Sequence, residues 1–253
     1  MDSTIARHKR DWNELADYDA YWAVLTRRDR KDGRWDRDEF FATGDAEVAG
    51  VLERCAGVDR PQRWDRALDY GCGVGRLTRA LGGRFGEAVG IDIADRMVAL
   101  AREANADRSN CTFVVGSGVD LSGLESGSFD FVYCSLVLQH LPEVRLAERL
   151  IEDFMRVVRP DGIVVFQLPS RIEWWARPRF RRRLFAALRS VGVNSRFLIG
   201  PVRSNPMRMN SMAPEQVQSV VAEAGGEVLT SHIDPLAPPR FNSTVYYAVP
   251  KRP

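Results

Sequence analysis

Three glycines in a short stretch constrain this chain more than any other feature of its sequence. The segment "ALDYGCGVGRLTRAL", residues 67–81, places Gly71, Gly73 and Gly75 between an apolar run and a segment with helical apolar spacing. Glycine is costly to order, so such a cluster indicates a tight turn whose backbone closely approaches a ligand or another element. The pattern predicts a strand over 66–71, then a turn, then a helix over 74–85.

The alternation of short apolar strands and amphipathic helices continues toward the C-terminus. Further strands are expected over 87–94, 163–170, 227–233 and 243–250, and residues 111–121 and 129–141 are each expected to form a strand that runs into a loop. Helices are expected over 95–106, 146–158 and 213–226, and a turn at 159–162. Strands that alternate with helices are typical of βαβ units, which form a parallel sheet covered on both faces. The sequence therefore predicts an α/β fold.

The composition is that of an ordinary globular protein. Of 253 residues, 45% are hydrophobic and 28% are charged, and the net charge of +2 produces no general attraction to nucleic acid or anionic membrane. The four cysteines are widely spaced and form no CxxC pair, so we expect no metal site and a reducing compartment. With no secretory signal and no apolar stretch long enough to span a bilayer, we expect a cytoplasmic protein.

Asp92 narrows the choice of ligand for the glycine turn. It ends the second expected strand, where an acid can accept hydrogen bonds from ribose hydroxyls. A dinucleotide fingerprint would require a third glycine at position 76, but Arg76 stands there and would obstruct the packing of helix on strand. A purely structural turn is the other alternative, and the acid at the end of the second strand argues against it.

The run "LDYGCGVGRL" resembles the first motif of class I S-adenosylmethionine-dependent methyltransferases. That motif is a glycine-rich loop opened by an acid two residues before its first glycine, the position of Asp69. The resemblance implies that this loop binds S-adenosylmethionine, with S-adenosylhomocysteine as the product. It assigns the cofactor-binding residues Asp69, Gly71, Cys72, Gly73 and Gly75.

Four later stretches extend the resemblance through residue 168, and the last of them, "VVRPDGIVVF", resembles the entry to the fifth strand. "VGIDIADRM" places Asp92 on the ribose, with Ile93 and Met97 on the two faces of adenine. "FVVGSGVDL" resembles the turn around the adenine edge, which implies the cofactor contacts Ser117, Gly118 and Val119. "FDFVYCSLVLQHLP" implies that Cys134 and Ser135 lie nearest the cofactor sulfur, and the resemblance assigns Ser135 to the cofactor site.

The resemblance also implies a division of the chain. We expect a doubly wound, mostly parallel seven-stranded sheet with helices on both faces, in a methyltransferase domain over 58–253. Residues 1–57 are expected to form an N-terminal helical lid, and residues 171–210 a cap inserted after the fifth strand. The lid hypothesis assigns Phe41 and Thr43 to the cofactor and Tyr21 to the substrate; the alternative is a pair of amphipathic helices packed on the core.

The acceptor side is less constrained by motifs. His140 is the candidate general base because its ordinary pKa of about 6.5 suits proton transfer near neutrality; the alternative is that it packs within the loop. Candidate substrate contacts outside the lid are Gln139, Trp174, Trp175, Met207 and Met209. The arginine-rich segment 171–189 is either a patch for an acidic partner or a solvated helix face.

These observations predict S-adenosylmethionine-dependent methyl transfer to an O, N or C centre of a small apolar or aromatic metabolite. A methyltransferase for RNA or protein is one alternative, although "CSLV" replaces the Asn/Asp-Pro-Pro-Tyr/Phe signature of many nucleic-acid enzymes that methylate amino groups. A domain that binds the cofactor without transferring its methyl group is another. The acceptor and the oligomeric state are left open by the sequence.

Overall fold

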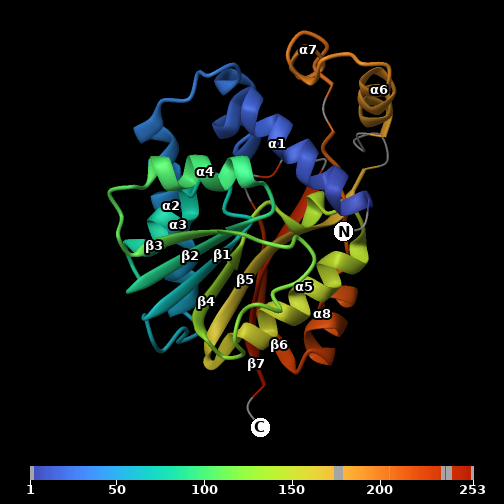
Figure 1. The fold of residues 1–253 in the computed structure, drawn as a ribbon. Helices are drawn as coiled ribbons and strands as arrows, with labels where there is room; N and C mark the ends of the chain where they lie inside the picture. The colour runs from blue at the N-terminus through green and yellow to red at the C-terminus, as the bar shows by residue number, and fades with distance from the viewer. Residues whose placement is uncertain (1–2, 174–178, 205, 235–236, 238–240, 252–253) are drawn as a thin grey trace.

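A seven-stranded mixed sheet with helices on both faces forms the centre of the molecule (Figure 1). This computed structural model describes residues 3–173, 179–204, 206–234, 237 and 241–251, with the side chains of 179–181 excepted. The strands are β1 (Arg66–Tyr70), β2 (Glu87–Asp92), β3 (Cys111–Val115), β4 (Phe129–Cys134), β5 (Val158–Ile172), β6 (Gly226–Ile233) and β7 (Phe241–Pro250). The helices are α1 (Ser3–Val24), α2 (Arg37–Ala56), α3 (Arg76–Gly82), α4 (Asp95–Ala104), α5 (Val144–Val157), α6 (Arg179–Ser190), α7 (Ser195–Ile199) and α8 (Pro214–Glu223), with short 3-10 turns at Arg28–Arg30 and Leu138–His140.

The strand order is β3-β2-β1-β4-β5-β7-β6. The first five strands pair in parallel, whereas β7 lies antiparallel between β5 and β6. The strand order reverses direction beside β1, so the carboxyl ends of β1 and β4 are where a doubly wound sheet binds its ligand. The expected seven-stranded, mostly parallel fold is confirmed.

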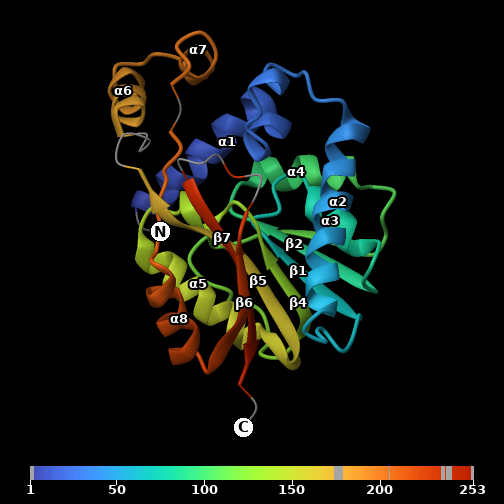
Figure 2. The same cartoon turned by 180° about the vertical axis from the view of Figure 1, so that it is seen from behind.

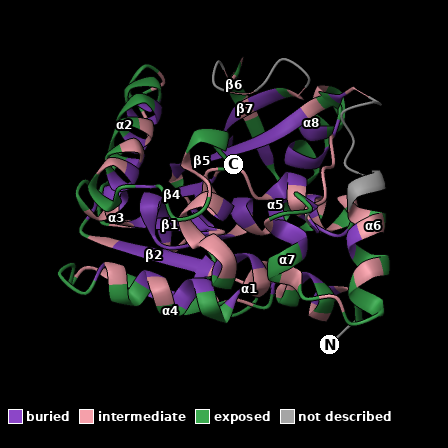
Figure 3. Cartoon of the chain, turned by 90° about the horizontal axis from the view of Figure 1, so that it is seen from above, coloured by how far each residue is buried: buried purple, intermediate pink, exposed green. Residues whose placement is uncertain are grey.

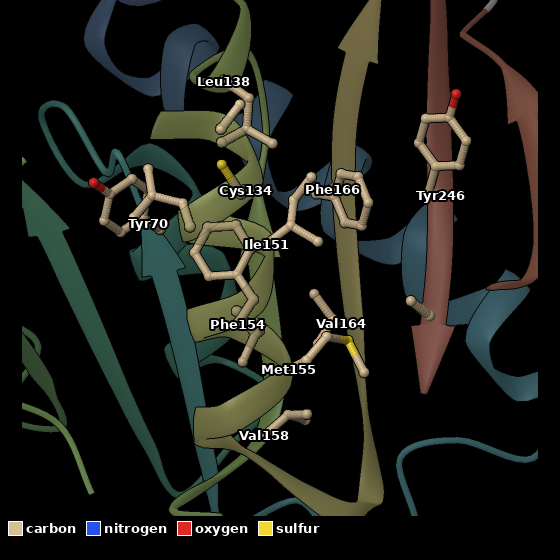
Figure 4. Close-up of a cluster of buried hydrophobic side chains, with 14 of the residues drawn as sticks. Tyr70, Cys134, Leu138, Ile151, Phe154, Met155, Val158, Val164, Phe166 and Tyr246 are labelled. Atoms are coloured by element: carbon tan, nitrogen blue, oxygen red, sulfur yellow. The ribbon is translucent and has the colours of Figure 1, made fainter. Parts of the chain in front are cut away.

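The two sheet faces are packed by different helices, as Figures 1 and 2 show from opposite sides. Alternate residues of each central strand point to opposite faces, and both sets are buried. On one face, Tyr70, Cys134 and Phe166 pack with Phe154 and other residues of α5 and α8 (Figure 4). Figure 3 shows that the central strands are buried along most of their length, while the outer sides of α2 and α4 are exposed.

The opposite face is covered by α2 and α3. Val48 and Leu52 of α2 share a buried cluster with Ala67, Phe131 and Val165 of the sheet. Helix α2 is therefore part of the core layer, and within residues 1–57 it is α1 that lies beyond the ends of the parallel strands (Figure 1). A third cluster joins α1 to the inserted segment, where Leu15 packs with Phe185 and Leu198.

The prediction of a turn at 159–162 is wrong. The chain continues through these residues as the first part of β5, because Val158 already pairs with Phe129 of β4. The pairing of β4 with β5 changes register between Phe129, which pairs with Val158, and Phe131, which pairs with Ile163. The additional residues of β5 form an irregularity at this point of the sheet.

Candidate active site

The glycine loop connects β1 to α3 in left-handed backbone conformations. Gly71, Gly73 and Gly75 have φ values of 79°, 53° and 82°. The N–H groups of Gly71 and Cys72 both donate to the carbonyl oxygen of Ile91, at 2.7 and 3.0 Å, which ties the loop to the end of β2. A residue with a Cβ atom is strained in this region, so the loop needs glycine at each of these positions.

Neighbouring side chains also exclude a Cβ atom from this loop. A Cβ on Gly73 would lie 2.7 Å from Val24 Cγ2 at the end of α1, and one on Gly71 would collide with Val137. A Cβ on Gly75 would lie 2.7 Å from the ring of Phe113 on β3. The loop is thus fitted between α1, the segment after β4 and the sheet.

Asp92 holds the loop from the end of β2. Its Oδ2 accepts the N–H of Gly73 at 2.9 Å, and its Oδ1 accepts the N–H of Ala94 at 2.8 Å. Burial raises the pKa of this carboxyl, and these backbone hydrogen bonds oppose the rise. Each carboxylate oxygen can accept a second hydrogen bond, so Asp92 can hold the loop and also bind hydroxyl groups in the cavity that it lines.

Asp69 lies behind the loop, outside the lining of the cavity. The Thr78 hydroxyl donates to its Oδ2 at 2.6 Å, while its Oδ1 is buried without a hydrogen-bond partner among the described residues. Burial raises the pKa of Asp69 to about 7, against the hydrogen bond from Thr78 and the charge of Arg76. An unpartnered buried carboxylate oxygen is costly, and an approaching donor would satisfy it.

A cavity of about 1700 Å³ opens at the carboxyl ends of β1 and β4. It is bounded by the end of α1, by α2, by the loop after β4, by the inserted segment and by β6 and β7. Among the residues predicted for the site, its lining includes Thr43, Gly71, Cys72, Gly73, Asp92, Ile93, Met97, Gly118, Ser135, Gln139, His140, Met207 and Met209. One space thus joins the predicted cofactor and acceptor residues.

Other predicted residues lie outside this lining. Gly75 begins α3 behind the loop. The hydroxyl of Ser117 bonds with Asp120 and accepts the N–H of Val119, so it organises the turn around Gly118 and is itself exposed. Gly116 and Gly118 face the cavity instead of Ser117 and Val119.

The predicted lid contacts Tyr21 and Phe41 lie in an aromatic cluster. Tyr21 stacks on Phe40 with ring centroids 4.4 Å apart, and Phe41 packs edge-on against both rings. Neither Tyr21 nor Phe41 lines the cavity, whereas Val24 and Leu25 of the same segment do. These rings support the wall formed by α1. Trp174 and Trp175, predicted to contact the substrate, lie outside the described residues.

Successive side chains at the end of β4 point to opposite faces of the sheet, which separates the two residues expected nearest the cofactor sulfur. Ser135 lines the cavity, but Cys134 points to the opposite face, into the cluster packed by α5 (Figure 4). The expectation for Cys134 is therefore wrong. The next residue, Leu136, has a φ of 61°, a strained value for a side chain of this kind. Its N–H donates to Oε1 of Gln167 at 3.1 Å, which fixes the turn after β4.

His140 lines the cavity with both ring nitrogens engaged. Its Nδ1 lies 2.6 Å from the carbonyl oxygen of Arg208, and its Nε2 lies 3.2 Å from Nε2 of Gln139. A carbonyl only accepts, so Nδ1 carries the proton and Nε2 accepts from the Gln139 amide. Burial lowers the pKa of His140, and the hydrogen bond to Arg208 opposes this, so the ring is neutral near pH 7.

Glu47 was missed by sequence reasoning. It lies on α2, where its Oε1 accepts the hydroxyls of Tyr133 and Ser135 at 2.8 Å each and its Oε2 accepts Arg76 Nη2 at 2.7 Å. Arg76, the residue in place of a third fingerprint glycine, is buried and pairs α3 with α2. A single acid within a helix carries no motif, so only the tertiary contact identifies Glu47.

His8 was also missed, because it lies far from the motifs in sequence. It is buried beside Trp12, whose ring packs edge-on against His140 with centroids 5.6 Å apart. The pKa of His8 is lowered to about 4, chiefly by burial and to a smaller extent by the neighbouring His140 and Arg208. Both His8 and Trp12 line the cavity.

Two further findings concern the described part of the chain. None of its helices combines the length and apolar character needed to cross a membrane. Its His, Cys, Asp and Glu residues form no group of three or more that could hold a metal ion.

Comparison with protein families matches residues 68–166 to the family described as "Methyltransferase domain". This segment runs from β1 through most of β5 and contains the glycine loop and Asp92. Residues 68–166 form a methyltransferase domain. Residues 68–166 hold the predicted cofactor motifs of this domain, whereas α1, α2, β6 and β7 lie outside the match.

Curated relatives resemble the methyltransferase domain over part of their length. A demethylmenaquinone methyltransferase of Staphylococcus aureus (strain MRSA252) is 35% identical over 103 residues, which are 40% of this chain and 41% of that protein. The match therefore spans less than half of this relative.

Solved structures resemble the chain over nearly its whole length. Magnesium protoporphyrin IX methyltransferase from Synechocystis PCC 6803, with bound SAH, has a TM-score of 0.58 at 18% identity and covers 95% of this chain and 100% of its own. A SAM-dependent methyltransferase from Leishmania major has a TM-score of 0.66 at 14% identity, and the match covers 97% of this chain and 82% of that protein. At these identities the likeness establishes the fold of the methyltransferase domain.

Proposed function

We propose that the protein is an S-adenosylmethionine-dependent methyltransferase acting on an O, N or C centre of a small apolar or aromatic molecule. The observation that carries this proposal is the single cavity that joins the glycine loop and Asp92 to Ser135 and His140. Methyl transfer needs the donor and the acceptor aligned in one water-excluding space, which such a cavity provides.

The residues present fit the cofactor. Asp92 has free acceptor capacity for ribose hydroxyls, and Ile93, Met97 and Gly118 form an apolar wall suited to adenine. The unpartnered Oδ1 of Asp69 adds an unsatisfied acceptor behind the loop. When bound, S-adenosylmethionine supplies a methyl group on a sulfonium, an already good leaving group.

The chain contributes alignment, enclosure and a proton acceptor. Val24 at the end of α1 and the following Leu25 close the cavity above the glycine loop, which supports the proposal that the N-terminal segment acts as a lid. For a hydroxyl or protonated amine acceptor, we assign the proton to Nε2 of His140. The Gln139 amide occupies that lone pair in this structure, so an acceptor hydroxyl has to replace it.

The decisive experiment is a metabolite-library screen with S-adenosylmethionine, read by mass spectrometry for products heavier by one methyl group. We expect a product with the protein and its loss with Asp92→Ala. The same screen with total RNA and protein extracts tests the macromolecular alternative. Tight S-adenosylhomocysteine binding with no methylated product from any of these pools would instead favour a non-methylating cofactor domain.

A further inference from the structure

The cavity extends beyond the glycine loop and the end of β4. Its volume of about 1700 Å³ exceeds the range of roughly 300–1,000 Å³ typical of a single small-molecule site. The lining continues along the sheet face that α2 covers, from residues of α2 to residues of β6 and β7. Figure 2 shows these elements from that side. We call this part the α2–β7 groove, lined by Ala46, Gly50, Val51, Glu53, Arg54, His232, Asp234, Phe241, Ser243, Val245 and Tyr247.

The middle of the groove is apolar. Every second residue of β7 from Phe241 to Tyr247 faces it, as expected for one face of a strand. Opposite them, Gly50 leaves open space on α2, because a Cβ at this position would meet no atom within 4 Å. An elongated apolar body fits between this helix and β7.

Two hydroxyl groups in the groove have no partner. Tyr247 Oη and Ser243 Oγ are buried and make no hydrogen bond among the described residues. Buried polar atoms are nearly always satisfied, because an unsatisfied one is costly. These two hydroxyls therefore point to a ligand that carries a polar group.

Arg54 supplies a positive charge at the Tyr247 end of the groove. Arg54 forms no ion pair among the described residues, yet its charge acts on both Tyr247 and His232. The neighbouring carboxylates have partners, since Glu47 binds Arg76 and Asp234 accepts Nε2 of Gln167 at 2.6 Å. Glu53 also lines the groove, but its side chain is exposed and forms no ion pair with Arg54 among the described residues.

We propose that the α2–β7 groove is an acceptor subsite, in which Arg54 and Tyr247 bind a carboxylate at the far end of an elongated apolar acceptor, while Ser243 lies about four residues along β7 beside the body of that acceptor. The planar guanidinium matches a carboxylate through paired hydrogen bonds, and the Tyr247 hydroxyl supplies a further donor. The inference rests on the proposed function, because it places the reacting end of the acceptor beside Ser135. It predicts acceptors that are apolar acids.

The test measures binding of a chain-length series of 4-hydroxyphenylalkanoates and the matched primary amides by calorimetry, with and without S-adenosylhomocysteine. For the chain length that fits best, the carboxylate is expected to bind about tenfold more tightly than the amide, as a charge-assisted hydrogen bond allows. Arg54→Met should abolish this preference. Arg145→Met, which removes an exposed arginine from α5 on the opposite sheet face, is the matched control and should retain it.

Two further variants test the subsite independently, in case Arg54→Met fails to fold. Gly50→Leu fills the open space on α2 and should weaken the carboxylate and the amide alike, with no loss of S-adenosylhomocysteine affinity. Tyr247→Phe keeps the ring and should reduce only the carboxylate preference. Equal binding of acid and amide, or equal losses in the two arginine variants, overturns the subsite even if the protein methylates other compounds. A preference that depends on Arg54 supports it even if S-adenosylhomocysteine fails to bind, the result that would overturn the proposed function.

Discussion

The Nδ1 of His140 donates to the carbonyl oxygen of Arg208 across 2.6 Å, which ties the loop after β4 to the inserted segment. This bond fixes the tautomer that leaves Nε2 as the acceptor toward the cavity. Nε2 of His140 can therefore accept a proton from a molecule in the cavity once the Gln139 amide no longer donates to it.

His140→Gln should lower kcat by about 10²–10⁴, the range for a positioned general base, for a hydroxyl or protonated amine acceptor. Because burial lowers the pKa of His140, the wild-type kcat/KM should stay high as the pH falls below the ordinary histidine value of about 6.5. The acid limb should then disappear in the variant. Calorimetry with S-adenosylhomocysteine is the control and should show unchanged affinity. Near-normal turnover with the same acid limb would mean that His140 only packs.

Asp92→Ala should weaken S-adenosylmethionine binding by about 1.5–3 kcal/mol, the scale of hydrogen bonds to a charged acceptor. The carboxylate is proposed to accept hydrogen bonds from the ribose hydroxyls, and it accepts the N–H of Gly73. The variant therefore loses both a contact with the cofactor and the hydrogen bond that anchors the loop. Isothermal titration provides the measurement, with Asp38→Ala on the exposed first turn of α2 as the control. A folded Asp92 variant with full affinity would remove this residue from the site.

Gly73→Ala should destabilise the protein by about 1–3 kcal/mol through its left-handed backbone, with an added clash against Val24. Val24→Ala should relieve the clash but not the strain, so the double variant should recover part of the loss. Gly127→Ala has a similar φ of 61° in open space and measures the strain alone. Denaturant unfolding of the full cycle gives the coupling energy. Strict additivity would show that α1 does not press on the loop.

Trypsin should cut the apo protein after Arg27 and Arg28, which are exposed between α1 and α2 and also line the cavity. If opening this segment releases the ligand, S-adenosylhomocysteine at 100 times its Kd should slow the cut by up to about 100-fold. Cleavage after the exposed Lys251 is the internal control and should not change. Equal cleavage with and without ligand would leave a packed helix in place of a lid.

Acid should destabilise the wild type relative to His8→Gln. The folded protein keeps His8 neutral down to a pKa of about 4, while the unfolded chain takes up the proton near the ordinary value of 6.5. The wild-type stability relative to the variant should therefore fall by about 3 kcal/mol as the pH drops from 7 to 4. Urea unfolding of both proteins across this range provides the measurement. A constant difference would place His8 in contact with water.

The local parts of the site were predictable from the sequence. A glycine loop, the acid before it and Asp92 lie at strand ends that hydrophobic spacing predicts, and Gly71, Gly73 and Asp92 do meet in the cavity. The choice between Cys134 and Ser135 depends on which sheet face holds the cavity. A motif gives no register, so that choice required the structure.

The remaining walls depend on contacts between distant segments. His8, Glu47 and Tyr247 come from the N-terminal helix, from α2 and from the last strand, and no short pattern links them. Their proximity follows from packing: α2 lies on the sheet through Val48 and Leu52, and β7 enters the sheet beside β5. Such long-range pairing has no signal in a single sequence.

The division of the cavity between shared and unshared segments has a consequence for how such proteins diversify. Residues 68–166, the part that resembles other methyltransferases, contain the glycine loop and Asp92, whereas α2, β6 and β7 build the far groove. Substitutions in the outer segments can change which molecule is modified while the donor end stays intact. The residues proposed to bind the methyl donor and those proposed to bind the acceptor thus lie in different segments of the chain. Each set can change in evolution without the other.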